Sequence, residues 1–383
     1  MATTTNSALE AGDGVAAEGI IGAIFDTTFI PAVTIAVWTA ATPVAEPSAL
    51  LLALAGLGLL WGVAPAQTEA ASLKPHGSAS LPPRAAATAL VSLAPARALQ
   101  CCIAASLLRG GSMELTDKVA VITGGASGIG RAVAAAMARR GVKGVALADM
   151  SEAVEDVATR LNAEAGRVFA IPFQGNTTDE KFRSSVFDAI EQKFGRATLC
   201  VPAAGITRDD LAVRVDKNTG KARIYPVEQF KLVVDVNLIA PVYWALEMIG
   251  RIAEDRARRA LKRWTPEEGT QGSVVFIGSI SSQGNRGQIS YASTKAGLEG
   301  AAATIMKEAM FYGVRCGVIH PGFTDTPMVR AMGMEYVAKN ILPYTQLGRL
   351  IQPEEIADAI CFMLTNSAVS GELWVDAGWH APA

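Results

Sequence analysis

The stretch VAVITGGASGIG, residues 119–130, decides the fold of this chain. Four of its first five residues are apolar, which is typical of a buried strand, and a glycine-rich turn follows directly. Beyond the turn, Ile129, Val133 and Met137 share one face of an expected helix that ends at Gly141. A strand, a glycine turn and a helix form the context of a dinucleotide site. Glycines let the backbone approach a pyrophosphate, and the helix N-terminus stabilises its charge.

The next apolar run, residues 145–148, ends at Asp149, nineteen residues beyond the glycine turn. A carboxylate at the end of a second strand accepts hydrogen bonds from the adenosine ribose hydroxyls and repels a 2′-phosphate. Met150 and Ser151 add no compensating positive charge. Arg131 is the cation nearest to the turn, and at a helix start we expect its side chain to be solvated. The sequence therefore favours NAD over NADP.

Helical and extended patterns alternate along the rest of the chain. Such alternation indicates a doubly wound α/β fold, in which a parallel sheet is covered by helices on both faces and ligands gather at the carboxyl ends of the strands. The expected helices span 152–164, 182–194 and 353–364, and the expected strands span 168–173, 199–201, 274–277, 314–319 and 373–375.

Two further elements are expected between the fourth and fifth strands. Alternating residues around Asn218-Thr219-Gly220 predict a small hairpin over residues 213–225. The next helix carries Asn237 and is expected to continue to about Trp264. A basic run from Arg256 onward near its end is expected to be a solvated helix terminus.

The 383 residues suffice for one large α/β domain, expected over residues 113–383, with an extension over 1–112. Residues 113–383 hold thirty basic and thirty acidic residues, so nothing indicates a nucleic-acid partner. The five cysteines form no Cys-x-x-Cys pair and the three histidines lie far apart, so no metal site is expected. The odd, unpatterned cysteine count fits a reducing compartment, cytoplasm or organelle matrix.

The first 112 residues differ from the rest in composition. The uncharged run at 49–64 is shorter than the ~20 residues that a spanning helix usually needs. Residues 70–113 contain no acidic residue and four spread basic ones, which resembles an organelle transit segment. A poorly ordered, functionally idle extension and a membrane anchor are the alternatives. We expect no membrane attachment through residues 113–383.

A second stretch, SYASTKAG at residues 290–297, places Tyr291 and Lys295 four positions apart on one face of an expected helix. A phenol titrates near pH 10, so it is a poor base at neutral pH unless a positive charge stabilises its phenolate. Lys295 can supply that charge. Ser279 ends the preceding strand, twelve residues earlier, which leaves enough chain to loop back to the phenol. His320 is expected to be a packed structural residue.

These motifs, in this order and spacing, resemble those of the short-chain dehydrogenase/reductase family. The resemblance covers about residues 113–379 and rests on residues 123–130, Asp149, Asn237, Ser279, Tyr291 with Lys295, and Pro321-Gly322. It implies a single Rossmann-type domain of seven parallel strands that binds a nicotinamide cofactor. It also implies an enzyme that interconverts small alcohols and carbonyls. Family members are usually homodimers or homotetramers joined through the helices that carry Asn237 and Tyr291.

The resemblance also assigns roles to residues. Tyr291 is the expected general acid/base, Lys295 is expected to lower its pKa and hold the nicotinamide ribose, and Ser279 is expected to orient the substrate oxygen. Asn237 is expected to support a water in the proton relay. Ser281 is a second candidate, because Ser279 lies one residue nearer the tyrosine than is commonest. The expected cofactor contacts are Thr123, Gly124, Ser127, Gly128, Ile129, Gly130, Asp149, Asn176, Thr177, Ala203, Gly205, Tyr291, Lys295, Pro321, Gly322, Thr324 and Thr326.

Two departures from the family pattern bear on function. Residues 202–205 read Pro-Ala-Ala-Gly where relatives usually carry Asn-Asn-Ala-Gly, and Asn176 stands where relatives usually have Asp. The leading hypothesis is an NAD-dependent oxidoreductase for a secondary alcohol and its ketone. Residues 347–359 are similar to 3-oxoacyl-carrier-protein reductases, which makes an NADPH-linked 3-oxoacyl-thioester reductase the first alternative. A catalytically weak NAD(H)-sensing binding protein is the second.

Overall fold

The structure is a computed structural model, and it describes residues 113–379. The predictions made for residues 1–112, a transit segment, an idle extension or a membrane anchor, lie outside the described residues.

A seven-stranded parallel sheet forms the centre of the described chain, with the strand order β3-β2-β1-β4-β7-β8-β9. The order reverses between β1 and β4, so the crevice for a ligand opens at the carboxyl ends of these two strands. The doubly wound fold predicted from the sequence is thereby confirmed. The strands are β1 (Val119–Thr123), β2 (Gly144–Asp149), β3 (Ala170–Gln174), β4 (Leu199–Pro202), β7 (Gly272–Ile277), β8 (Val314–Pro321) and β9 (Gly371–Val375).

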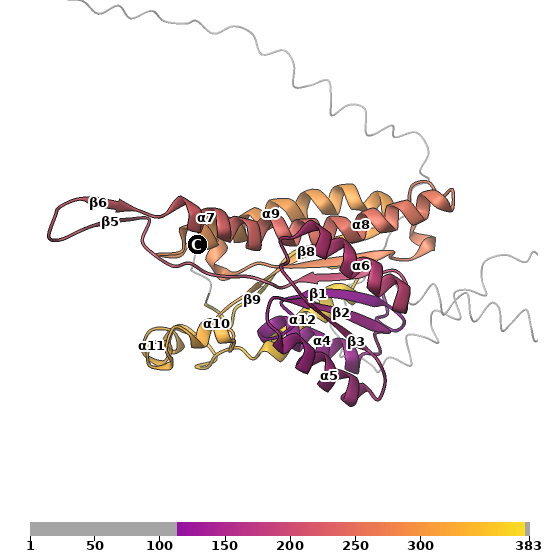
Figure 1. The fold of residues 1–383 in the computed structure, drawn as a ribbon, viewed down its shortest axis with the longest axis horizontal. Helices are drawn as coiled ribbons and strands as arrows, with labels where there is room; N and C mark the ends of the chain where they lie inside the picture. The colour runs from indigo at the N-terminus through magenta and orange to yellow at the C-terminus, as the bar shows by residue number, and fades with distance from the viewer. Residues whose placement is uncertain (1–112, 380–383) are drawn as a thin grey trace, which may run out of the picture. The chain divides into compact units, whose positions relative to one another are not determined.

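Helices cover both faces of the sheet (Figure 1). Strand β1 shows why, because Ile122 faces one hydrophobic core and Val121 faces the other. A strand buried on both faces has no polar alternation in its sequence. One face carries α4 (Gly128–Arg139), α5 (Ala153–Ala165) and α12 (Pro353–Thr365), and the other carries α6 (Glu180–Phe194), α8 (Ala240–Arg258) and α9 (Ile289–Ala309).

Several further elements follow the carboxyl ends of β4, β7 and β8. The predicted hairpin is confirmed as β5 (Val213–Val215) paired with β6 (Ala222–Ile224), and it projects away from the sheet (Figure 1). Helix α7 (Val227–Val234) runs through a π-helical turn, η1 (Asp235–Ile239), into α8. Two short helices, α10 (Pro327–Arg330) and α11 (Met334–Asn340), follow β8, and a 3-10 turn, η3 (Ile280–Gln283), follows β7.

At the end of α8 one prediction was wrong and another was confirmed except at one residue, since Arg258, Arg259, Lys262 and Arg263 of the basic run are exposed as expected. The helix ends at Arg258 instead of continuing to Trp264, and Ala260 adopts a left-handed φ of 54°. Arg256 is not solvated but 1% exposed, because its guanidinium donates to Glu268 (2.6 Å from Nη1 to Oε2) and to the Lys262 carbonyl. The paired carboxylate lets a cation lie in a packed interior that the sequence pattern alone does not reveal.

Residues 227–258 form a helical segment that is long and apolar enough to cross a membrane by length and composition, with a mean hydropathy of 1.6 over an 18-residue window. A core helix of the same composition passes this test equally well. Here Trp244, Met248 and Ile252 are fully buried against the sheet, and the Trp244 indole donates to the Thr177 carbonyl at 2.8 Å. The segment is therefore packed as a core helix.

Candidate active site

The glycine turn after β1 has a backbone that only glycine fits. Gly124 and Gly128 have φ values of 69° and 50°, in the left-handed region that side chains rarely adopt. A Cβ added at Gly130 would lie 2.2 Å from the Gly124 carbonyl oxygen. Ser127, at the N-cap of α4, makes no capping bond with its side chain, and the first turn of α4 carries no acidic residue. This helix N-terminus can therefore bind an anion.

A cavity of about 520 Å³ lies along this turn and the ends of the neighbouring strands. We call it the larger cavity. It brings together thirteen of the predicted cofactor residues, from segments that are far apart in the sequence. They are Gly124, Ser127, Gly128, Ile129, Gly130, Asp149, Asn176, Thr177, Ala203, Gly205, Tyr291, Lys295 and Thr326.

The other predicted cofactor residues lie elsewhere. Pro321, Gly322 and Thr324 line the neighbouring, smaller cavity. Thr123 is 2% exposed and lines neither cavity. Its hydroxyl accepts a hydrogen bond from the Ala204 amide at 3.1 Å, so Thr123 supports the cavity wall from behind.

Asp149 lies at the wall of the larger cavity and holds the glycine turn in place. One carboxylate oxygen accepts a hydrogen bond from the Ala126 amide at 3.0 Å, and the other accepts one from the Ser151 amide at 2.9 Å. An ionised carboxylate has further acceptor capacity for a diol. The uncapped helix N-terminus, the glycine backbone and this carboxylate together fit the pyrophosphate and ribose of a nicotinamide dinucleotide.

Asn237 braces the loop after β4. Its Nδ2 donates to the Ile206 carbonyl at 2.8 Å, and its Oδ1 accepts from the Ile206 amide at 2.9 Å. The residue is fully buried in the π-helical turn η1, and single π turns are frequent at functional sites. Asn237 and Thr123 therefore hold residues 204–206 in place, although Pro202 and Ala203 before them have no polar side chain.

Tyr291 and Lys295 project from the first turns of α9 into the larger cavity. The Lys295 ammonium donates to the Ile277 carbonyl at 2.7 Å and lies 5.3 Å from the centre of the Tyr291 ring. Burial lowers the pKa of Lys295 to about 8. The same desolvation raises the pKa of Tyr291 to about 12, whereas a hydrogen bond with the Ser279 side chain acts in the lowering direction. The expected lowering of the Tyr291 pKa by Lys295 is thus not seen, because burial dominates.

The structure distinguishes the two candidate serines by their partners. The Ser279 side chain forms a hydrogen bond with the Tyr291 side chain. Ser279 Oγ also accepts a hydrogen bond from the Ser281 amide at 3.1 Å. The Ser281 hydroxyl instead donates to Gln288 Oε1 at 2.9 Å. Both serines line the smaller cavity, and Ser279 lies beside Tyr291 whereas Ser281 bonds within the loop between β7 and α9.

A smaller cavity of about 150 Å³ adjoins the larger one, and Tyr291 lines both. Its apolar wall includes Phe323, Met328 and Met332. Asp209 is its one charged residue, and the Asp209 carboxylate accepts from the Gln288 side chain at 2.9 Å. Neither Asp209 nor Gln288 was predicted from the sequence. The position of Asp209 after the fourth strand is the one signal that could have indicated it.

His320 is fully buried at the end of β8, as expected for a packed residue. Its ring stacks on Trp374 at 4.2 Å between centroids. It lines neither cavity. Its Nδ1 lies 3.2 Å from the Ser279 carbonyl oxygen, so His320 contacts the backbone of the site and not its interior.

The comparisons agree with this geometry. The family described as short chain dehydrogenase matches residues 118–336. The chain is 30% identical over 272 residues to the 3-oxoacyl-[acyl-carrier-protein] reductase of Escherichia coli, which covers 70% of this chain and 99% of that relative. It is 31% identical over 264 residues to the 3-oxoacyl-[acyl-carrier-protein] reductase of Homo sapiens, covering 68% and 98%.

Among solved structures, a short-chain type dehydrogenase/reductase from Mycobacterium marinum has the same fold, with a TM-score of 0.60 at 23% identity over 70% of this chain and 98% of that one. The family match spans more than half of the chain, and the curated relatives are covered almost completely. The chain therefore belongs to the short chain dehydrogenase family, and it is an NAD(P)-dependent oxidoreductase that acts on CH–OH groups.

Proposed function

We propose that this enzyme uses NAD(H) to interconvert a secondary alcohol and its ketone, with Tyr291 as the proton donor and acceptor. The observation that carries the proposal is the position of Tyr291, which lines both cavities, bonds to Ser279 and lies beside Lys295. A hydroxyl at the junction of a cofactor cavity and a substrate cavity can reach the oxygen of a substrate whose carbon faces the cofactor.

We assign a separate role in the reaction to each of Ser279, Tyr291 and Lys295. A bound nicotinamide supplies or accepts the hydride. Ser279 Oγ hydrogen-bonds the substrate oxygen, and Tyr291 gives a proton to that oxygen during ketone reduction. The Lys295 ammonium stabilises the phenolate that forms. Because the pKa of Tyr291 is raised to about 12, the phenol is protonated at neutral pH, and this favours the reductive direction.

Asp149 supports NAD(H) over NADP(H). It places a carboxylate at the wall of the larger cavity, where a ribose diol would donate hydrogen bonds to it and a 2′-phosphate would be repelled. The residues that line this cavity include two cations, Arg208 and Lys295. Both belong to segments that follow β4 and β7, not to the β2 end that carries Asp149.

The charge of the smaller cavity favours a substrate whose reacting end is uncharged. Asp209 contributes a negative charge, and none of the lining residues is Lys, Arg or His. A free carboxylate next to the ketone would therefore be repelled. A 3-oxoacyl thioester meets this requirement, and the relatives in Escherichia coli and Homo sapiens are named 3-oxoacyl-[acyl-carrier-protein] reductases. Thioester reduction is accordingly the second candidate function.

A cofactor titration of the full chain with NADH and NADPH, combined with a panel of short ketones, steroids and 3-oxoacyl thioesters, tests the proposal. We expect tighter binding of NADH and turnover of at least one uncharged ketone. Micromolar NADH binding without turnover of any member would instead support the weak NAD(H)-sensing protein. Preference for NADPH with turnover confined to thioesters would support the second candidate.

An Asp209→Asn variant tests the charge argument. Removing one negative charge close to the substrate is worth roughly 1 kcal/mol in a watery site, or about fivefold in rate. We expect kcat/KM for a free 3-oxo acid to rise by about that factor, while kcat/KM for its ester changes little. The ester is the internal control, and an equal change for both substrates would contradict the proposed repulsion.

Homo-oligomerisation stays a proposal. The outer side of α8 and the adjoining π turn exposes Ile239, Tyr243 and Leu246, with 45%, 51% and 41% of their surfaces accessible. Three large apolar side chains along one helix support self-association there. Light scattering on the full chain measures the assembly, and a monomer at micromolar concentration would contradict it.

A further inference from the structure

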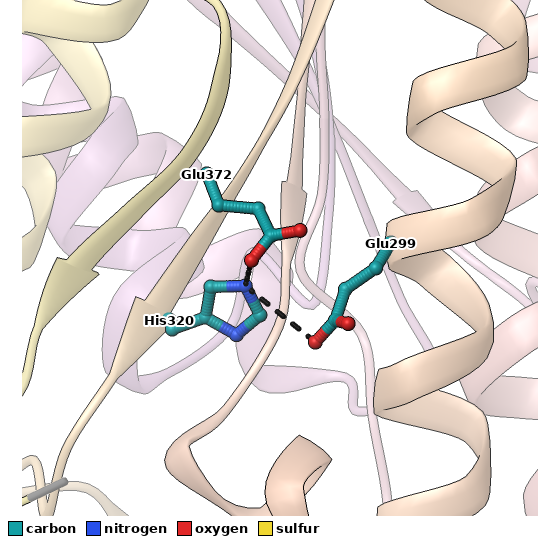
Figure 2. A group of neighbouring side chains, drawn as sticks. All are labelled: Glu299, His320 and Glu372. Atoms are coloured by element: carbon teal, nitrogen blue, oxygen red, sulfur yellow. Dashed lines mark ion pairs between the residues drawn. The ribbon is translucent and has the colours of Figure 1, made fainter. Parts of the chain in front are cut away.

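Three side chains from three elements meet beside the outer strand pair of the sheet. They are Glu299 of α9, His320 of β8 and Glu372 of β9, and Figure 2 shows both carboxylates directed at the same ring nitrogen. His320 Nε2 lies 3.4 Å from Glu372 Oε2 and 3.8 Å from Glu299 Oε1. The three donor atoms lie within 4.8 Å of one another. The cluster lies outside both cavities, so the proposed reaction does not use it.

His320 Nε2 is the unusual atom in this cluster. The His320 side chain is 0% exposed, yet Nε2 has no hydrogen-bond partner. Two neighbours hold the ring in this orientation. Trp374 stacks on it with an interplanar angle of 13°, and a Cβ added at Gly278 would lie 2.6 Å from His320 Nδ1. A buried polar atom without a partner is costly, so a ligand that Nε2 can bind would relieve that cost.

The donor set is suited to a first-row divalent metal. One imidazole nitrogen and two carboxylate oxygens are typical zinc ligands, at about 2.0–2.2 Å from the ion. Bonds of that length in a tetrahedron separate the donors by about 3.3–3.6 Å. The two nitrogen–oxygen distances, 3.4 and 3.8 Å, are close to that separation. The Glu299 and Glu372 side chains are 30% and 41% exposed, so an ion and its water ligand can enter from solvent.

The second ring nitrogen also fits metal binding. Nδ1 lies 3.2 Å from the Ser279 carbonyl oxygen. A histidine that binds a metal through Nε2 carries its proton on Nδ1 and usually donates it to a carbonyl or carboxylate. The Ser279 carbonyl is placed to accept that proton when Nδ1 carries it, whereas in the other tautomer Nδ1 accepts a hydrogen bond from the Ser279 amide at 3.3 Å. Metal binding would therefore select one tautomer of His320 and tie it to the backbone of the serine that bonds to Tyr291.

We propose that Glu299, His320 and Glu372 bind one first-row divalent cation of the Zn²⁺ type, with water as the remaining ligand. The site is independent of the proposed activity, because none of its residues lines either cavity. No metal site was predicted from the sequence, because its histidines lie far apart and its cysteines form no Cys-x-x-Cys pair. These three residues are brought together only by the pairing of β8 with β9 and by the packing of α9 on β8.

The test is competition for Zn²⁺ between the full chain and a chromophoric chelator. Glu299→Gln and Glu372→Gln keep side-chain size and remove one ligand charge each. Glu308→Gln is the matched control, because Glu308 is exposed on the same helix as Glu299. We expect wild type and the control to bind Zn²⁺ equally, and each of the other variants to bind it at least tenfold more weakly. Thermal melts with and without Zn²⁺ should show stabilisation of wild type and the control only.

A second measurement needs no substitution. Co²⁺ bound by imidazole and carboxylates shows visible d–d bands without a thiolate-to-cobalt charge-transfer band. This distinction matters because residues outside the described range include Cys101, Cys102, His76 and His380. Micromolar Co²⁺ uptake without the thiolate band supports the proposed site. Absence of Zn²⁺ and Co²⁺ binding at micromolar concentration, or binding that both glutamine variants retain, overturns it.

Discussion

The two adjoining cavities are built in different ways. The larger one depends strongly on backbone, since the glycine turn, the N-terminus of α4 and the loop after β4 supply ten of its twenty-two lining residues, four of them glycines. The smaller one is shaped by side chains from segments that follow three different strands, among them Asp209, Gln288 and Phe323. A cavity with a wall of backbone suits a ligand that does not vary, and it restricts which residues can form that wall. A side-chain cavity can change its ligand without changing the fold.

The glycine turn offers the severest test of the backbone cavity. We predict that Gly130→Ala weakens NADH binding by at least a hundredfold, because its Cβ would lie 2.2 Å from the Gly124 carbonyl oxygen and the turn must shift. Fluorescence titration with NADH measures the loss. Gly250→Ala in α8 is the matched control, because no atom lies within 4 Å of its added Cβ. Wild-type affinity in Gly130→Ala would show that the turn does not hold the cofactor.

The pH dependence separates the two titrating groups at the junction of the cavities. Burial lowers the pKa of Lys295 to about 8, so its ammonium is charged below that pH and neutral above it. The pKa of Tyr291 is raised to about 12, so the phenol stays protonated throughout the working range. We predict that kcat/KM for ketone reduction falls as pH rises through about 8, by up to tenfold per unit.

Initial rates between about pH 6 and pH 10 measure this profile, with NADH affinity and circular dichroism recorded at each pH as controls. A profile that stays flat to pH 10 would contradict the lowered pKa of Lys295 or its role. A rate that rises with pH would mean that reduction depends on the phenolate.

A smaller effect is expected from Asp149→Ala. Hydrogen bonds to a charged group are worth about 1.5–3 kcal/mol, so the preference for NADH over NADPH should fall by roughly ten- to a hundredfold. Asp156→Ala, an exposed substitution on α5, is the control. Parallel KM measurements with NADH and NADPH test this prediction. An unchanged preference for NADH over NADPH in Asp149→Ala would mean that Asp149 does not reach the ribose.

The difference between the cavities also explains what the sequence could predict. Thr123, Gly124 and Asp149 belong to one continuous strand, turn, helix and strand unit, so their spacing indicates their geometry. The hairpin at 213–224 was predicted for the same reason, because Asn218-Thr219-Gly220 is a local turn signal. These features depend on residues that are neighbours in the chain.

Features that depend on distant residues were missed. Arg256 was expected to be solvated because its partner Glu268 lies beyond the end of α8. Asp209 meets Gln288 only after the chain has passed through the β5–β6 hairpin, helices α7 and α8 and strand β7. The raised pKa of Tyr291 is a consequence of burial, which the four-residue spacing to Lys295 does not report.

Replacement of Tyr291 by Phe tests the central claim most directly, because this residue joins the two cavities. The substitution removes one hydroxyl and keeps the ring that lines both. Loss of a general acid typically costs ~10²–10⁴ in rate. We predict that the single-turnover rate of NADH oxidation by an uncharged ketone falls by that factor, while the NADH dissociation constant changes by less than about threefold. A Tyr291→Phe enzyme that reduces the ketone at the wild-type rate would contradict the account.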